Sequence, residues 1–172
     1  MKKETSIRFS VDKENKKIRV KREFAAPVSE VWTAWTDSRW LDRWWAPKPW
    51  TAKTKSMEFK EGGHWLYAMV GPDGSTHWSR ADFSTIEPLR KFSALDAFSD
   101  ENGKIDKSFP TSIWINEFSG EADITSVAVE ISYEKLEDLE KMLEMGIREG
   151  FTSGLDNLEE LLSKKQWKLK AK

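Results

Sequence analysis

One long amphipathic stretch near the C-terminus constrains the fold more than any other feature of the chain. Between residues 135 and 165 the apolar side chains recur at intervals of three and four, which is the spacing of one face of an α-helix. These side chains are Leu136, Leu139, Leu143, Ile147, Phe151, Leu155, Leu158 and Leu162. A helix with one apolar face must bury that face against another element. The preceding residues must therefore supply one extended apolar surface.

Residues 51–133 can supply that surface as a run of strands. Short segments with alternating apolar and polar residues are separated by turn sequences, of which Gly71-Pro72-Asp73-Gly74 is the clearest. Strands that are joined by short turns form an antiparallel meander. Residues 6–24 show the same alternation and predict an N-terminal strand or hairpin, whereas residues 29–45 predict two short helices.

This order of elements predicts an α+β fold in a single domain, residues 1–172. A curved antiparallel β-sheet would grip one long C-terminal helix, residues 135–165, and the two short helices would follow the first strand or hairpin. The helix is the only predicted element that is long enough to cover the sheet.

Composition excludes several classes of function. The 172 residues include 28 Lys and Arg against 29 Asp and Glu, a balance unsuited to a general nucleic-acid binder. Cysteine is absent and only 2 histidines are present, which excludes thiolate zinc sites, cysteine nucleophiles and three-histidine metal sites. No apolar run is long enough to span a bilayer, and the first residues lack a signal-peptide core. We therefore expect a cytoplasmic protein without metal, cofactor, nucleic-acid partner or membrane insertion.

Tryptophan is far more frequent than usual, with ten residues in the chain. An indole ring carries a large apolar area and an N–H donor that needs a partner. These rings can fill an ordinary core, or they can form the wall of a central cavity for an apolar ligand. The sequence leaves both alternatives open.

Three glycines, Gly146, Gly150 and Gly154, lie four residues apart in the predicted helix and so fall along one side of it. Each costs about 1 kcal/mol in a helix relative to alanine. Their missing side chains either allow close approach of the helix backbone to the sheet or leave space for a ligand between the two. These two explanations also remain open.

Short motifs are spaced along nearly the whole chain in an order typical of one superfamily. They are Ala26-Pro27-Val28-Ser29-Glu30-Val31-Trp32, Trp44-Trp45-Ala46-Pro47, Glu61-Gly62-Gly63-His64-Trp65, Val70-Gly71-Pro72-Asp73-Gly74, Ile86-Glu87-Pro88, Met145-Gly146-Ile147-Arg148-Glu149-Gly150-Phe151 and Leu155-Asp156-Asn157-Leu158. Together they make residues 20–163 resemble the helix-grip superfamily (START-like, Bet v 1-like, SRPBCC). Within it, the chain is most similar to the subgroup related to the C-terminal domain of the activator of Hsp90 ATPase.

The resemblance implies an antiparallel sheet wrapped round the long helix, with an internal cavity formed by that helix, the sheet and the two short helices. Members of the superfamily bind lipids, sterols, polyketides or other apolar molecules, and a few are cyclases or hydrolases. The resemblance therefore implies ligand binding more directly than it implies a reaction.

Few residues are candidates for catalysis. His64 and His77 could act as general bases, but the period of two along a strand places His64 on the face opposite Trp65. Arg80 and Asp82 share one face of a strand, either as an internal polar anchor or as an exposed ion pair. Asp96 and Glu117 are carboxylates to which no motif assigns a role.

We therefore predict a protein that binds a small hydrophobic or aromatic ligand in an internal cavity. The predicted lining residues are Trp45, Trp65, Tyr67, Met69, Trp114, Met142, Gly146 and Gly150. The rings would supply apolar contact, the glycines would supply space, and the Tyr67 hydroxyl would orient a polar end. One alternative is a protein-interaction or co-chaperone-like module with a protein partner, and another is an enzyme of the cyclase or hydrolase kind.

Overall fold

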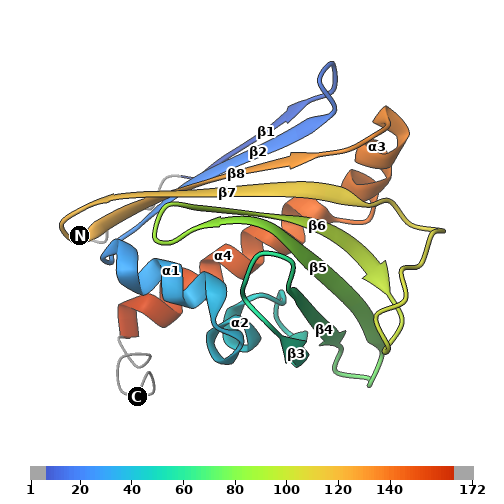
Figure 1. The fold of residues 1–172 in the computed structure, drawn as a ribbon, viewed down its shortest axis with the longest axis horizontal. Helices are drawn as coiled ribbons and strands as arrows, with labels where there is room; N and C mark the ends of the chain where they lie inside the picture. The colour runs from blue at the N-terminus through green and yellow to red at the C-terminus, as the bar shows by residue number, and fades with distance from the viewer. Residues whose placement is uncertain (1–6, 165–172) are drawn as a thin grey trace.

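The computed structural model describes residues 7–164 and contains one eight-stranded antiparallel sheet (Figure 1). The strand order is β1-β2-β8-β7-β6-β5-β4-β3. The strands are β1 (Ile7–Asp12), β2 (Lys17–Phe24), β3 (Thr51–Met57), β4 (His64–Val70), β5 (Thr76–Glu87), β6 (Lys91–Ser99), β7 (Ser112–Glu121) and β8 (Ile124–Ser132). The predicted α+β class and antiparallel sheet are confirmed.

Alternation of apolar and polar residues explains how these strands face the core. Along β2, the side chains from Ile18 to Phe24 alternate between buried and exposed positions, which is the pleat of a strand with one face in the core. The register shifts between Thr54 and Ser56 and again between Phe83 and Ile86. Irregularities of this kind increase the local bend and twist of a sheet, and they accompany its curvature here.

Two short helices connect β2 to β3. They are α1 (Val28–Thr36) and α2 (Ser38–Trp44). Asp37 separates them, because it ends α1 and its carboxylate accepts a hydrogen bond from Arg39 N at 2.9 Å at the start of α2. Trp40 and Trp44 of α2 are each 1% exposed, so this short helix is held mainly by burial of large side chains.

The C-terminal stretch differs from the prediction, because it forms two helices rather than one. These are α3 (Leu136–Glu144) and α4 (Ile147–Lys164). Gly146 has a φ of +92°, and its N–H donates to Leu143 O at 3.1 Å, as expected for a glycine that ends a helix. The continuous helix predicted for residues 135–165 is therefore broken after α3, and its last residue lies outside the described residues.

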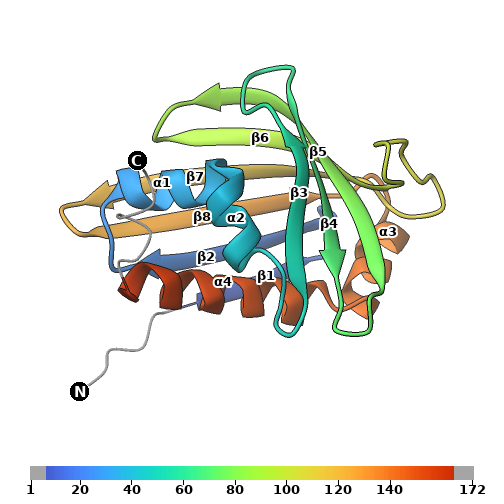
Figure 2. The same ribbon diagram turned by 90° about the horizontal axis from the view of Figure 1, so that it is seen from below.

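The longer helix, α4, lies along the concave side of the sheet, next to α1 and α2 (Figure 2). Leu155 and Leu158 are 2% and 0% exposed and anchor it in the core. An ion pair also joins α4 to β2, because the buried Arg22 donates to Asp156 at 2.7 Å and to Glu159 at 3.0 Å. The sheet thus grips α4 from one side while the short helices contact it from another.

Candidate functional site

Trp45 lies at the centre of an aromatic cluster inside the sheet. It follows the last residue of α2, and its backbone N–H donates to Leu41 O at 2.9 Å. Its ring centroid lies 5.3–6.0 Å from five other rings, which come from α1, α2, β4, β7 and α4: Trp35, Trp44, Trp65, Trp114 and Phe151. We call these six rings the aromatic cluster.

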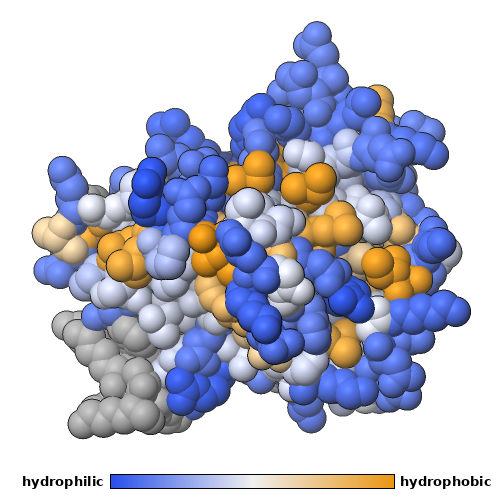
Figure 3. All heavy atoms as spheres, viewed as in Figure 1, coloured by the Kyte–Doolittle hydropathy of each residue, from blue (hydrophilic) through white to orange (hydrophobic). Residues whose placement is uncertain are grey.

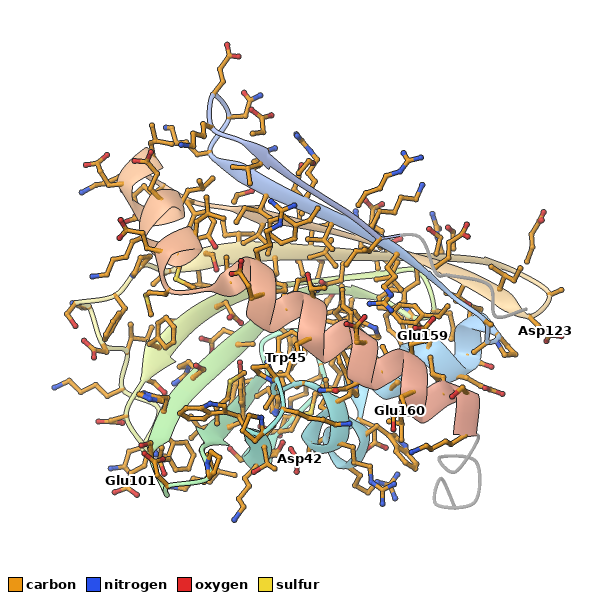
Figure 4. All side chains as sticks on the ribbon, turned by 180° about the vertical axis from the view of Figure 1, so that it is seen from behind. Asp42, Trp45, Glu101, Asp123, Glu159 and Glu160 are labelled. Atoms are coloured by element: carbon orange, nitrogen blue, oxygen red, sulfur yellow. The ribbon has the colours of Figure 1, made fainter. Side chains whose placement is uncertain are left out.

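Hydrogen bonds orient the cluster. The Trp45 indole N–H donates to the Tyr67 hydroxyl at 3.0 Å, and the Tyr67 ring stacks on Trp65 with 3.9 Å between centroids. The Trp65 indole donates to Thr54 Oγ1 at 2.9 Å. Thr54 in turn donates to Asp42 of α2 through its N–H at 3.0 Å and its hydroxyl at 2.6 Å. In Figure 4, Asp42 and Trp45 lie below α4.

A cavity of about 30 Å³ lies against the aromatic cluster, which is room for roughly one or two water molecules. Its lining residues are Trp35, Leu41, Trp45, Met57, Trp65, Ala81, Phe83, Phe92, Ala94, Asp96, Trp114 and Asn116. A central cavity is thus present where it was predicted. It is much smaller than expected, because the large aromatic rings occupy most of the interior.

The glycines do not provide the expected space. A Cβ on Gly154 would lie 3.0 Å from Trp45 O and 3.3 Å from Trp44 O, so this glycine allows α4 to approach the end of α2 closely. A Cβ on Gly150 would make only an ordinary contact, 3.9 Å from Pro47 Cγ, and Gly146 ends α3. Of the two explanations for the glycines, close packing applies at Gly154.

Two polar side chains, Asp96 of β6 and Asn116 of β7, are part of the otherwise apolar lining. Asn116 is 3% exposed; its amide nitrogen donates to Phe92 O at 3.4 Å, and its Oδ1 has no hydrogen-bond partner. Burial, followed by the charge of the nearby Asp82 carboxylate, raises the pKa of Asp96 to about 7. Within residues 7–164, no hydrogen bond or ion pair reaches the Asp96 carboxylate.

Sequence reasoning gave no role to Asp96, although a signal for one was available. Phe92 and Ala94 are buried on the same strand, and the period of two continues to Asp96. A carboxylate that continues the inward-facing set of a strand is rarer than an apolar residue there. Its position alone marks it as a candidate functional residue.

Two tyrosine hydroxyls are influenced by the same carboxylate. Burial raises the pKa of Tyr67 well above its usual range, and the Asp96 charge adds to the rise. Burial and then Asp96 likewise raise the pKa of Tyr133, whose hydroxyl has no hydrogen-bond partner. Both hydroxyls therefore keep their protons at neutral pH and can act as hydrogen-bond donors.

The structure brings some of the predicted lining residues together and not others. Trp45, Trp65 and Trp114 line the cavity, and Tyr67 contacts two of them. Met69 and Met142 are partly buried against the hydrophobic core but lie outside the cavity lining, as do the glycines at positions 146 and 150. A ligand-binding role for these residues remains a prediction.

The candidate bases lie away from the cavity. His64 is on the face of β4 opposite Trp65 and shares a hydrogen bond with Ser56 Oγ at 3.0 Å. The exposed His77 has its ring 5.5 Å from that of Trp50.

Arg80 and Asp82 form an ion pair on the outer face of β5. The closest contact between them is 2.6 Å, and Arg80 also donates to Gly103 O at 2.7 Å. Since Ala81 and Phe83 line the cavity, the alternation of the strand places this ion pair on the other side of the sheet. Of the two interpretations of Arg80 and Asp82, the ion pair on the outer face therefore applies, and the internal polar anchor does not.

Within the described part of the chain, residues 7–164, no group of three or more His, Cys, Asp or Glu side chains is arranged to hold a metal ion. No helix in the same range is long and apolar enough to cross a membrane.

Sequence comparison places most of the chain in a known family. Residues 25–163 match the family described as Activator of Hsp90 ATPase homolog 1-like protein. The chain belongs to this family. No curated protein matches the chain.

Solved structures with the same fold come from several bacteria. Protein Ms6760 from Mycobacterium smegmatis is 28% identical, with a TM-score of 0.84 over 92% of this chain and 97% of its own. A protein from Arthrobacter aurescens is 31% identical, with a TM-score of 0.87 over 91% of each chain. The AHSA1 protein from Silicibacter pomeroyi, 19% identical with a TM-score of 0.70 over 87% of this chain and 99% of its own, shares the fold.

Proposed function

We propose that this chain binds a small, mainly apolar molecule inside the sheet, against the aromatic cluster. The observation that carries the proposal is a cavity with an aromatic wall in which Asn116 Oδ1 is buried without a hydrogen-bond partner. The half-buried Asp96 carboxylate in the same wall has no hydrogen bond or ion pair within residues 7–164. Buried polar groups are normally satisfied, and leaving them unpaired costs free energy. A ligand that brings apolar surface and a donor to these positions would remove that cost.

The volume of about 30 Å³ means that such a ligand must displace a side chain. Trp45 is the best candidate, because it is partly buried and precedes a segment, residues 46–50, that forms no helix or strand. The backbone on either side is held by Asn157 of α4, which donates to Trp44 O at 3.4 Å and to Ala46 O at 3.0 Å. In this proposal the Trp45 ring rotates outward while the backbone stays in place, and it loses its hydrogen bond to Tyr67.

Calorimetric titration with a panel of small aromatic compounds (indole, phenol and 2-naphthol) tests this proposal. We expect binding to the wild-type protein and a changed affinity in the Trp45→Leu variant. Trp78→Ala is the matched control, because Trp78 lies on the opposite face of β5 from the cavity-lining Ala81. If no compound binds either the wild type or the Trp45→Leu variant, the interior is a packed core and the proposal is wrong.

A second candidate function is a protein-interaction role, in keeping with the family. Leu95 and Ile113 are 37% and 50% exposed and directly opposite each other on β6 and β7. Apolar side chains lie among hydrophilic ones on the face in Figure 3. Paired exposed apolar residues of this kind can contact a partner, although single ones are common on any surface.

The ATPase rate of purified Hsp90, measured with and without this chain, tests the interaction role. We expect stimulation that is lost in the Ile113→Lys variant and kept in a variant of an exposed residue elsewhere, Asp123→Asn. An unchanged ATPase rate with the wild-type chain rejects the co-chaperone-like role and leaves ligand binding unaffected.

A further inference from the structure

Asp96 is a carboxylate inside the sheet without a basic partner. Its register partners are Ala81 on β5 and Ser112 on β7, so the adjacent strands bring no positive charge opposite it. No Lys, Arg or His side chain is among the residues that line the cavity. The buried Arg22, by contrast, is paired with two carboxylates. The interior therefore has a negative group to which the described residues offer no counter-ion.

The remaining wall of the cavity consists largely of aromatic rings. Trp65 and Trp114 line it together with Asp96, and their rings are inclined at 70° and 51° to that of Trp45. Because these planes differ, the rings present their faces and edges in several directions. A cation is attracted to the face of an indole ring, and sets of inclined rings are a known means of binding organic ammonium groups.

We propose that the interior selects a small organic cation, a ligand with a protonated or quaternary ammonium group, with Asp96 as counter-ion and the rings of Trp65 and Trp114 as walls. This selectivity rests on the proposed function, because it concerns the class of molecule that the same interior takes. An anion would be repelled by Asp96, and a neutral apolar ligand would leave the half-buried carboxylate without a counter-ion. Only a cation uses both features of the wall.

The ionisation of Asp96 agrees with this selectivity. Burial, followed by the charge of Asp82 from β5, raises its pKa to about 7. The other groups coupled to it are Tyr67 of β4 and Tyr133, which follows β8, and both remain neutral at this pH. A bound cation stabilises the ionised carboxylate, so binding should strengthen as the pH rises through 7 and level off above it.

Asn116 lies at the other end of the cavity lining from Asp96. It pairs with Phe92, four residues along β6 from Asp96, which corresponds to about 13 Å along the strand. An ammonium held at Asp96 would not reach Asn116 Oδ1 unless the ligand were long and carried a donor at its other end.

A matched pair of probes separates the effect of charge from that of shape. Choline and its neutral carbon analogue 3,3-dimethylbutan-1-ol have nearly the same size, and both can be titrated at pH 8 and matched ionic strength by ligand-observed NMR. We expect the wild-type protein to prefer choline by about tenfold, in line with a cation–π contact and a buried counter-ion. We expect Asp96→Asn to abolish the preference, and at pH 5.5 the wild type should lose most of it.

Asp123→Asn is the control for overall charge, because Asp123 is exposed in the turn between β7 and β8 and lies far from Trp45 (Figure 4). This variant should keep the preference for choline. Equal binding of the two probes, or a choline preference that Asp96→Asn retains, overturns the selectivity but leaves the proposed function in place. If neither probe binds while the aromatic panel does, the selectivity is again wrong. If nothing binds at all, the proposed function falls with it.

Discussion

Asp96 follows Phe92 and Ala94 along the inward-facing side of β6, so the pleat of the strand carries a carboxylate into an aromatic interior. Trp45 enters the same interior from the end of α2, and its ring contacts one ring from each of α1, α2, β4, β7 and α4. At the scale of the residue, these two side chains define the proposed site: Asp96 would provide its charge, and the Trp45 ring fills the space that a ligand would take.

Replacing Asp96 by asparagine should stabilise the protein at alkaline pH. The pKa of Asp96 is about 7 in the folded protein against an ordinary value of 3.8, so between these values the folded state holds a proton that the unfolded state has released. The free energy of unfolding of the wild type therefore falls as the pH rises from about 4 to about 7. Asparagine avoids the cost of ionising this side chain in the folded state, so we expect Asp96→Asn to be more stable than the wild type at pH 8. The gain should be about 2 kcal/mol, less than the whole pKa shift would give, because Asp96 is partly exposed to water.

Urea denaturation of both proteins at pH 4.5 and pH 8 measures this difference, which should be small at the lower pH. A variant that is less stable than the wild type at pH 8 would mean that the carboxylate has a stabilising partner in the folded protein.

Removing the Trp45 ring should create a binding cavity for indole. Trp45→Ala leaves a space against the remaining rings of the aromatic cluster and should lower the free energy of unfolding by about 3 kcal/mol. Apolar cavities of this kind take up apolar ligands. Thermal denaturation with and without 2 mM indole should show a rise in the Tm of the variant and no comparable rise for Trp78→Ala. Equal shifts in the two variants would place the indole elsewhere.

At the scale of the element, the glycines of α3 and α4 have three different roles in the structure. Gly146 adopts a positive φ between the helices, Gly154 lies against the backbone of Trp45, and Gly150 has only a distant neighbour in Pro47. The sequence does not reveal this difference. A glycine that ends a helix, one that allows a close contact and one at an ordinary position can all recur at a spacing of four residues.

Alanine at each glycine should therefore have a different effect on stability. Gly150→Ala should stabilise the protein by about 0.5–1 kcal/mol, because alanine favours the helix and the new Cβ meets its neighbour at 3.9 Å. Gly146→Ala should cost about 1 kcal/mol because of the positive φ. Gly154→Ala should cost more than about 1 kcal/mol, because backbone atoms of the α2 end must move. Denaturation curves in urea give the order, and a destabilising Gly150→Ala would contradict it.

At the scale of the whole molecule, the sequence predicts the fold well because its patterns are strong. Alternation in strands such as β2 and β8, turn sequences between them and an amphipathic end lead directly to a sheet that grips a helix. The interruption at Gly146 was missed because the apolar spacing of three and four runs through it without a break. Only the backbone angle reveals that the helix stops there.

The size of the cavity could not be predicted from the sequence. Ten tryptophans are compatible with a hollow interior or a filled one, and only side-chain packing decides between them. Trp45, Trp65 and Trp114 border the cavity, and their contact with a ligand stays a prediction. Trp45 is turned inward, bonded to Tyr67, and takes up space that a ligand would need. The sequence therefore indicates which rings lie inside the sheet but not how closely they pack.

The most direct test of the account is ¹⁹F NMR of protein labelled with 5-fluorotryptophan, which reports on each of the ten tryptophans during titration with a ligand. Loss of a signal in the Trp45→Phe and Trp78→Ala variants assigns the two resonances that matter. We predict that choline or an aromatic compound that binds will shift the Trp45 resonance strongly and leave that of Trp78 unchanged. A bound ligand that leaves the Trp45 resonance unchanged would contradict the claim that this ring opens the interior.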